Sequence, residues 1–455
     1  MKLYDKSKID MENLMFDNKA LWAITFPVMV EQFLNCLMGT ADSMMVSNVG
    51  SAALSAVSCV DSINILVFQV FSALATGGTI LCSQYIGLGN KEKAKKSADQ
   101  VFLTVLFISV VLMLVCIYLK IPILRLVFGS VEEAVMTNAA TYFFITALSY
   151  PALALFDAGA AFMRASGNSR FPMNISIASN LINIAGNAIL IFGFDMGVAG
   201  AAIATTVSRY ISVIVVYIGL SKPNQPIVIN HYLAMRPDMP VILKVLSIGI
   251  PAGVENGMFQ FGKLAIQSSV STLGTTAIAA QAMAALMENF NGIIALGIGI
   301  AMMTVVGQSV GAGRKEESRY YIVKMSIWAE IVMVISVIVI LILTKPITLL
   351  ASMDPTAADM CFEMVVYISI VKPIVWTFAF LPSYGMRAAG DVRFSMLTSM
   401  CIMWFCRVAL STFLIRVVGI GILGVWIGMF SDWTIRAIIF SIRYMHGKWL
   451  DIKVI

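Results

Sequence analysis

Charged residues are scarce in this chain of 455 residues: Asp, Glu, Lys and Arg together make up 12% of it, against roughly a quarter in soluble proteins. Hydrophobic residues make up 59%, and the mean hydropathy is +0.88. This composition excludes an ordinary soluble domain and indicates an integral membrane protein. The formal net charge of +6 does not indicate nucleic-acid binding, because the basic residues lie in short loops between apolar segments.

Motifs of enzymatic and metal centres are also missing. The chain has only two histidines, and its seven cysteines are scattered without a CxxC pair, which argues against a zinc site or a disulfide framework. Neither a GxxxxGK[ST] phosphate-binding loop nor an HExxH pair occurs, so no nucleotide site is predicted. We therefore expect a protein that is not an enzyme and that needs no cofactor.

What the chain has instead is an internal repeat. Residues 24–31 (ITFPVMVE) recur as residues 248–255 (IGIPAGVE), a shift of 251 − 27 = 224 between the two prolines. Residues 84–92 return at the same shift as 308–316, and the Met-Arg-Ala turn at 163–165 returns at 386–388. A repeat of this length indicates one module used twice.

A membrane-spanning helix needs about 20 predominantly apolar residues, and the sequence predicts twelve of them. They cover residues 20–47, 54–86, 98–119, 137–161, 171–194, 198–220, 242–271, 277–310, 322–344, 360–385, 394–416 and 421–443. The expected fold class is an all-α membrane protein with two six-helix lobes related by a parallel repeat. We expect an N-terminal tail over 1–19, an N-lobe over 20–220, an interlobe linker over 221–241, a C-lobe over 242–443 and a C-terminal tail over 444–455.

The distribution of lysine and arginine predicts the orientation. Most of the basic loop residues lie on the side of the N-terminal tail, whereas the opposite loops hold only Lys120, Arg125, Lys345 and Arg416. Because basic loops face the cytoplasm, both termini are expected in the cytoplasm. The chain itself is expected in an inner or plasma membrane.

Polar side chains inside the predicted spans are the candidate functional residues, since ionisable groups at membrane depth are costly. In the first half Glu31, Asn35 and Asp42 share one face of the first helix. Asn183 and Asn187 lie four residues apart, on one face of the predicted helix over 171–194. The second half carries Glu255, Lys263, Gln281, Glu288 and Lys372. For each of these residues a static ion pair or an interhelical hydrogen bond is as good an explanation as a functional role. Asp42 is the exception, since a functional role is favoured there.

The same residues resemble the multidrug and toxic compound extrusion (MATE) family over nearly the whole chain. The resemblance rests on the paired Pro…Glu stretches, the Gly-Thr-Ala-Asp42 sequence, both Gln-x-x-Gly-x-Gly turns, both Met-Arg-Ala-x-Gly turns and the Gly-x-x-Gly-Ala-Ala-x-Ala-Thr205 sequence. It implies two six-helix lobes around a central cleft and alternating access. It also implies a cation-coupled antiporter that exports small organic, often cationic, compounds in exchange for sodium or protons.

The resemblance assigns roles to individual residues. Asp42 matches a first-helix aspartate tied to cation coupling, and Asn183, Asn187 and Thr205 match positions that line the first-lobe cation site, where sodium would bind. Asn187 stands where an aspartate is usual, which removes one charge. Glu255 matches a seventh-helix acid of the NorM-like branch, whereas Lys372 lies near the position of that branch's tenth-helix aspartate.

Other functions fit the sequence less well. A lipid-linked precursor flippase of the same superfamily shares the two-lobe plan, and a membrane-embedded enzyme has no visible catalytic constellation. The expected partners are small organic substrates and the bilayer, with no nucleic acid, and the chain is expected to be monomeric. We also expect Lys263 to neutralise Glu255 or Glu288 and to shape the substrate cleft.

Overall fold

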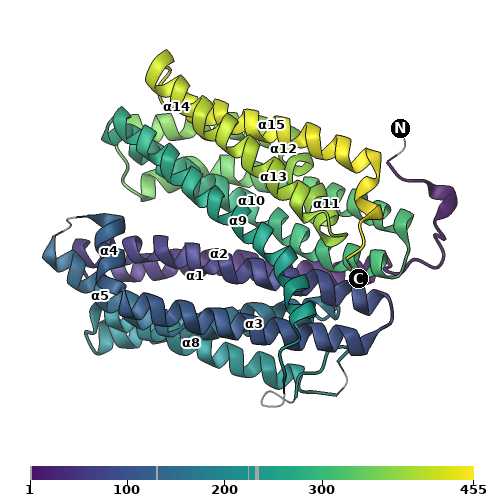
Figure 1. Cartoon of the computed structure of the whole chain (residues 1–455). Helices are drawn as coiled ribbons and strands as arrows, with labels where there is room; N and C mark the ends of the chain where they lie inside the picture. Colours follow the sequence, from purple (N-terminus) through teal and green to yellow (C-terminus); the bar gives the residue numbers. More distant parts are fainter. Residues whose placement is uncertain (1–2, 130–131, 224, 231–234, 455) are drawn as a thin grey trace. The chain divides into compact units, whose positions relative to one another are not determined.

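The computed structural model describes residues 3–129, 132–223, 225–230 and 235–454, and every regular element in them is helical (Figure 1). The α-helices are α1 (Asn18–Ser47), α2 (Ser51–Gly87), α3 (Lys91–Tyr118), α4 (Lys120–Phe128), α5 (Glu133–Leu148), α6 (Tyr150–Ala165), α7 (Arg170–Asn187), α8 (Gly197–Leu220), α9 (Met239–Val270), α10 (Thr275–Gly311), α11 (Lys315–Leu350), α12 (Pro355–Ala388), α13 (Val392–Ile402), α14 (Ser411–Phe413) and α15 (Leu423–His446). Short 3-10 turns are η1 (Lys6–Lys8), η3 (Ser271–Leu273) and η6 (Lys448–Asp451); π-helical segments are η2 (Ala188–Gly193), η4 (Met403–Leu410) and η5 (Leu414–Val418).

These helices confirm the predicted membrane fold. Among the described residues, eleven helices are long and apolar enough to span a bilayer, and the bent pair α5–α6 makes a twelfth span. The pair corresponds to the single span predicted over 137–161, but it bends by 44°. Pro151 lies in the first turn of α6, where its missing N–H costs nothing. The same proline cannot continue the hydrogen bonding of α5, so the span breaks at Ser149.

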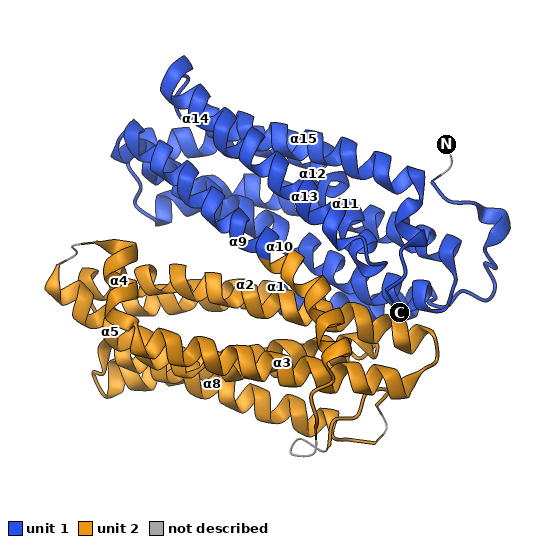
Figure 2. Ribbon diagram, viewed as in Figure 1, with its two compact units in different colours: residues 1–32, 254–455 blue, residues 33–253 orange. Residues whose placement is uncertain are grey.

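The chain forms two compact units, coloured separately in Figure 2: unit 1 comprises residues 1–32 and 254–455, and unit 2 comprises residues 33–253. The sequence repeat places the two lobes at 20–220 and 242–443, whereas the compact units divide inside α1 and inside α9. The first half of each of these helices therefore belongs to the unit built mainly from the other repeat. Within the predicted linker, residues 224 and 231–234 lie outside the described residues.

Glycines allow the first halves of α1 and α9 to pack closely on the units that they join. In unit 2, a Cβ at Gly77 of α2 would come within 3.0 Å of the Val245 carbonyl oxygen of α9. In unit 1, a Cβ at Gly297 of α10 would come within 2.8 Å of the Met29 Cα of α1. Small residues bring helix backbones together in membranes, where lipid gives apolar side chains no drive to associate. The two halves of the repeat thus use the same packing device.

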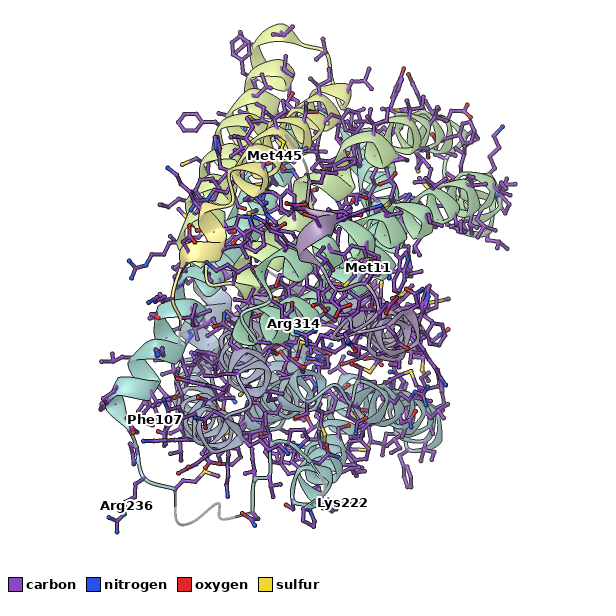
Figure 3. The ribbon with its side chains drawn as sticks, turned by 90° about the vertical axis from the view of Figure 1, so that its right-hand side faces the viewer. Met11, Phe107, Lys222, Arg236, Arg314 and Met445 are labelled. Carbon is purple, nitrogen blue, oxygen red and sulfur yellow. The ribbon has the colours of Figure 1, made fainter. Side chains whose placement is uncertain are left out.

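The N-terminal residues are hydrogen-bonded across one end of unit 1 (Figure 3, near Met11 and Arg314). The Asp5 amide donates to the Glu316 carboxylate at 2.9 Å, and the Phe16 amide donates to the Tyr321 hydroxyl at 2.8 Å. In unit 2, the end of the interlobe segment is held on α3, where Gln100 bonds the Arg236 carbonyl and the Asp238 amide. These contacts fix both segments at the ends of the helices they cover.

Candidate functional site

The four predicted coupling residues meet inside unit 2. The Asn187 amide donates to Asp42 Oδ1 at 2.5 Å and to Asn183 Oδ1 at 3.4 Å, and the Asn183 amide donates to Thr205 Oγ1 at 3.0 Å. Asn183 and Asn187 are fully buried, whereas Asp42 is half-buried. The result is one chain of hydrogen bonds that joins α1, α7 and α8.

The local sequence explains why α7 and α8 come close enough for this network. A Cβ at Gly186 of α7 would approach the Ala204 Cβ of α8 to 3.0 Å, so a larger residue there would separate the helices. Asn183 and Asn187 stand one turn apart on α7 and therefore present both amides to the same neighbours. The helix changes to the π-helical segment η2 directly after Asn187, and π-helical turns often occur at functional sites.

A second group of polar residues acts on Asp42 electrostatically. Asp61 accepts hydrogen bonds from the Asn64 amide at 3.2 Å and from the Tyr142 hydroxyl at 3.4 Å. The Tyr150 hydroxyl in turn donates to Asn64 Oδ1 at 2.8 Å. The two tyrosines escaped prediction because an aromatic residue in an apolar span reads as core packing.

One cation accompanies these acids. Arg209 of α8 donates to the Ser149 hydroxyl at 2.7 Å, and its charge acts on both Asp42 and Asp61. Two carboxylates and one guanidinium leave this part of unit 2 with one uncompensated negative charge when both acids are ionised. A buried excess of negative charge is a place where a cation or a proton binds.

The donor set around Asp42 fits a hard cation. Asn187 Oδ1 is buried and has no hydrogen-bond partner among the described residues, so one amide oxygen remains available beside the Asp42 carboxylate. Carboxylate, amide and hydroxyl oxygens are the ligands that hard cations take. Groups of three or more His, Cys, Asp and Glu side chains suited to a transition metal are absent from the part of the chain that the structure describes.

The acids predicted in the second half have partners of their own. Glu255 of α9 pairs with Arg387 of α12 at 2.6 Å, and Glu288 of α10 pairs with Lys372 of α12 at 2.6 Å. Among the described residues Lys263 forms a direct ion pair with neither acid, although its charge acts on Glu288. Arg387 and Lys372 reach the two carboxylates from α12, whereas Lys263 shares α9 with Glu255 and lies two turns further along it.

The remaining predicted residues of the cleft differ in exposure. Glu31 is buried in unit 1, Asn35 is exposed in unit 2, and Gln281 is buried with its Oε1 unpaired. A further ionic group, around Asp432 of α15, combines Arg436 at 2.8 Å and Arg407 at 3.8 Å. The structure thus separates the predicted residues into a network in unit 2 and a more strongly charged set in unit 1.

Duplicated membrane spans with charged residues inside them are the plan of many membrane transporters. The family model described as MatE matches residues 27–189 and again residues 251–413. The two matches are 251 − 27 = 224 residues apart, the same shift as the sequence repeat. The chain therefore belongs to the MATE family of transporters and is not an enzyme.

Individual relatives cover almost the whole chain. An uncharacterised transporter, YisQ, of Bacillus subtilis (strain 168) is 24% identical over 95% of this chain and 95% of its own. The probable multidrug resistance protein NorM of Thermotoga maritima is 25% identical over 98% of this chain and 96% of its own. A solved outward-facing structure of a multidrug resistance MATE transporter covers 94% of this chain and 96% of its own, with a TM-score of 0.88 at 20% identity. This likeness supports the same fold.

Proposed function

We propose that the chain is a multidrug efflux transporter that exports small organic compounds across the cell membrane in exchange for sodium ions or protons. Relatives described as probable multidrug resistance proteins support the efflux activity. The hydrogen bond from Asn187 to Asp42, at 2.5 Å inside unit 2, is the observation that carries the coupling proposal. This contact supports Asp42 as the coupling acid, because an amide donor holds its carboxylate.

In this proposal Asp42 carries the coupling charge. When the carboxylate is ionised, the Asn187 amide and the charge of Arg209 stabilise it. A sodium ion would bind the carboxylate, together with Asn187 Oδ1 and the Thr205 hydroxyl, whereas a proton would simply neutralise the acid. Either event changes the charge of the network by one unit, which is what an exchange cycle needs in order to sense the ion gradient.

The driving force is sufficient for export. One charge that moves through 100 mV is worth about 2.3 kcal/mol, which corresponds to roughly a fifty-fold concentration ratio. The basic loops on the side of the N-terminal tail support a cytoplasmic position of both termini. Ions that run into the cell would then drive substrates outward.

The test is efflux measured in inverted membrane vesicles, with sodium and proton gradients imposed separately and a panel of cationic and anionic dyes as substrates. Asp42→Asn keeps the size of the side chain and removes its charge. We expect gradient-driven transport to be lost, while the protein still inserts at the wild-type level.

The matched control is Asp359→Asn, because Asp359 is an exposed aspartate of α12 outside the network. This variant should transport like the wild type. Gradient-driven transport by Asp42→Asn at the wild-type rate would disprove the coupling role.

A further inference from the structure

A charged cluster in unit 1 contains more positive than negative side chains. Its members come from five helical elements and act on one another electrostatically: Lys263 (α9), Glu288 (α10), Lys372 (α12), Arg407 (η4), Asp432 and Arg436 (both α15). Four cations and two carboxylates leave a net charge of +2. Such an excess is unusual at membrane depth, where each unpaired charge is costly.

The ion pairs within the cluster show where this excess lies. Lys372 is fully buried and donates to both the carboxylate and the backbone carbonyl of Glu288, at 2.6 and 2.9 Å. Arg436 donates to Asp432 at 2.8 Å. These two pairs are neutral and close. They leave Lys263 and Arg407 as the cations without a carboxylate of their own.

The contacts of Arg407 and Lys263 show that these two cations carry the excess positive charge. The nearest carboxylate oxygen to Arg407 is 3.8 Å away, on an acid already bonded to Arg436, and the buried Arg407 Nε has no hydrogen-bond partner among the described residues. Lys263 is exposed, and in the described part of the chain no carboxylate lies within ion-pair distance of its ammonium group. Arg407 is in effect a donor with unused hydrogen-bonding capacity.

The two cations lie beside the same aromatic ring. The Lys263 ammonium and the Arg407 guanidinium each lie 5.1 Å from the centre of the Phe259 ring. Close packing of α9 on η4 produces this arrangement, because a Cβ at Gly262 would come within 2.4 Å of the Met403 side chain. Arg407 itself lies in a π-helical segment, a feature that is frequent at functional sites.

Electrostatics predicts what such a pair binds. Two like charges beside one ring repel each other, and the ring compensates only partly. An anionic group between them would accept hydrogen bonds from both and would relieve the repulsion. The partly buried Phe259 ring beside the two cations offers aromatic surface to the remainder of such a ligand.

We propose that Lys263 and Arg407, with Phe259 beside them, form a binding site for the anionic group of an aromatic organic acid that this transporter exports. The proposal deepens the efflux function proposed above and rests on it. It adds organic anions to the small organic, often cationic, compounds that the family resemblance implies. Carboxylates and phosphates share the required chemistry, so an anionic lipid headgroup is the alternative source that the experiment must separate.

The test compares binding of 1-naphthoate and of its neutral isostere 1-naphthamide to the full-length protein in phosphatidylcholine nanodiscs, by calorimetry without any ion gradient. A failure of ion coupling would leave this equilibrium measurement untouched. We expect naphthoate to bind and naphthamide to bind at least about tenfold more weakly. Lys263→Met and Arg407→Met should each weaken naphthoate binding by about tenfold or more, the effect of one lost charge-assisted hydrogen bond.

Lys324→Met is the matched control, because Lys324 also lies over aromatic rings of unit 1, those of Tyr320 and Trp328 at 5.0 and 5.8 Å, but belongs to no part of the cluster. It should bind naphthoate like the wild type. Thermal stability distinguishes binding from a structural role. Lys263→Met removes like-charge repulsion and no ion pair, so it should melt at or above the wild-type temperature, whereas Arg407→Met also loses the 3.8 Å contact with Asp432.

Three results would overturn the proposal: equal affinity for naphthoate and naphthamide, wild-type naphthoate affinity in both variants, or a marked loss of thermal stability in both. Displacement of naphthoate when phosphatidylglycerol is added to the nanodiscs would assign the cluster to a lipid headgroup instead. Retained binding in the presence of that lipid supports the organic acid.

Discussion

Replacement of Asp432 by asparagine should destabilise unit 1 more than almost any other change of a single charge. Asp432 is fully buried and is the one carboxylate within ion-pair distance of both Arg436, at 2.8 Å, and Arg407, at 3.8 Å, in the part of the chain that the structure describes. Asparagine keeps the size of the side chain and leaves the two guanidinium groups, both buried, without a counter-charge.

The size of the effect follows from these distances. At an effective dielectric constant of about 20, Coulomb's law gives about 6 kcal/mol of attraction at 2.8 Å and about 4 kcal/mol at 3.8 Å. The cost of removing three charges from water offsets much of this attraction in the wild type. In the variant the cost for the two arginines remains and the attraction is gone. Removal of one partner of a buried ion pair typically costs about 3–5 kcal/mol, and we expect a loss in this range.

The measurement is the free energy of unfolding in mixed detergent micelles, followed by tryptophan fluorescence. Asp451→Asn is the control, because its ion pair with Lys315, at 2.9 Å, is exposed on both sides; exposed pairs contribute at most about 1 kcal/mol. Adding Arg436→Gln to Asp432→Asn should recover part of the loss, because one uncompensated charge is removed. A loss below about 1 kcal/mol for Asp432→Asn would refute the reasoning.

Two further predictions concern a glycine contact and pH. Gly428→Ala should destabilise the protein by about 1–3 kcal/mol, because its Cβ would lie 2.9 Å from the backbone carbonyl of Cys406. Gly257→Ala, which has nothing within 4 Å of its Cβ, should be neutral or gain about 0.5–1 kcal/mol from helix propensity. Unfolding titrations compare the two variants directly, and equal stability would contradict the packing argument. The Lys96 side chain lowers the pKa of Asp238 below its ordinary value of 3.8. Asp238 therefore holds the interlobe segment on α3 most strongly at pH values above the ordinary pKa, and it releases the segment as the pH falls through the lowered pKa. Hydrogen exchange around Asp238, corrected for the intrinsic rate, should therefore accelerate in acid, and Asp238→Asn should remove that pH dependence; an unchanged dependence in the variant would contradict the assignment.

Hydrophobicity and repetition were enough to predict the membrane spans. The 224-residue repeat and the apolar runs predicted the twelve spans, because a bilayer demands about 20 apolar residues in a row whatever their neighbours are. The bend at Ser149 was not predicted, although Pro151 was visible in the sequence. A proline inside an apolar run signals a possible break, but the size of the bend depends on the packing of α5 and α6.

The identity of charge partners was less predictable. Spacing on a single helix brought Asn183 and Asn187 to one face, and the structure joins them to Asp42. Pairs between helices depend on the rotation of each helix, which periodicity does not specify. Arg387 lies in the repeated Met-Arg-Ala turn, and its pairing with Glu255 depends on how α9 and α12 pack. The same holds for the direct pair of Glu288 with Lys372.

The exchange of an ion for a substrate is the central claim, and reciprocal flux tests it most directly. Proteoliposomes with the purified protein are loaded with a transported dye at equal sodium concentration and equal pH on both sides. The dye is then diluted outside, and the internal sodium and pH are recorded with fluorescent indicators. Because coupling between two ligands is reciprocal, the outward dye gradient should drive one of the two ions inward, and Asp42→Asn should abolish that movement. Dye efflux without movement of either ion, or ion movement that persists in Asp42→Asn, would contradict the account.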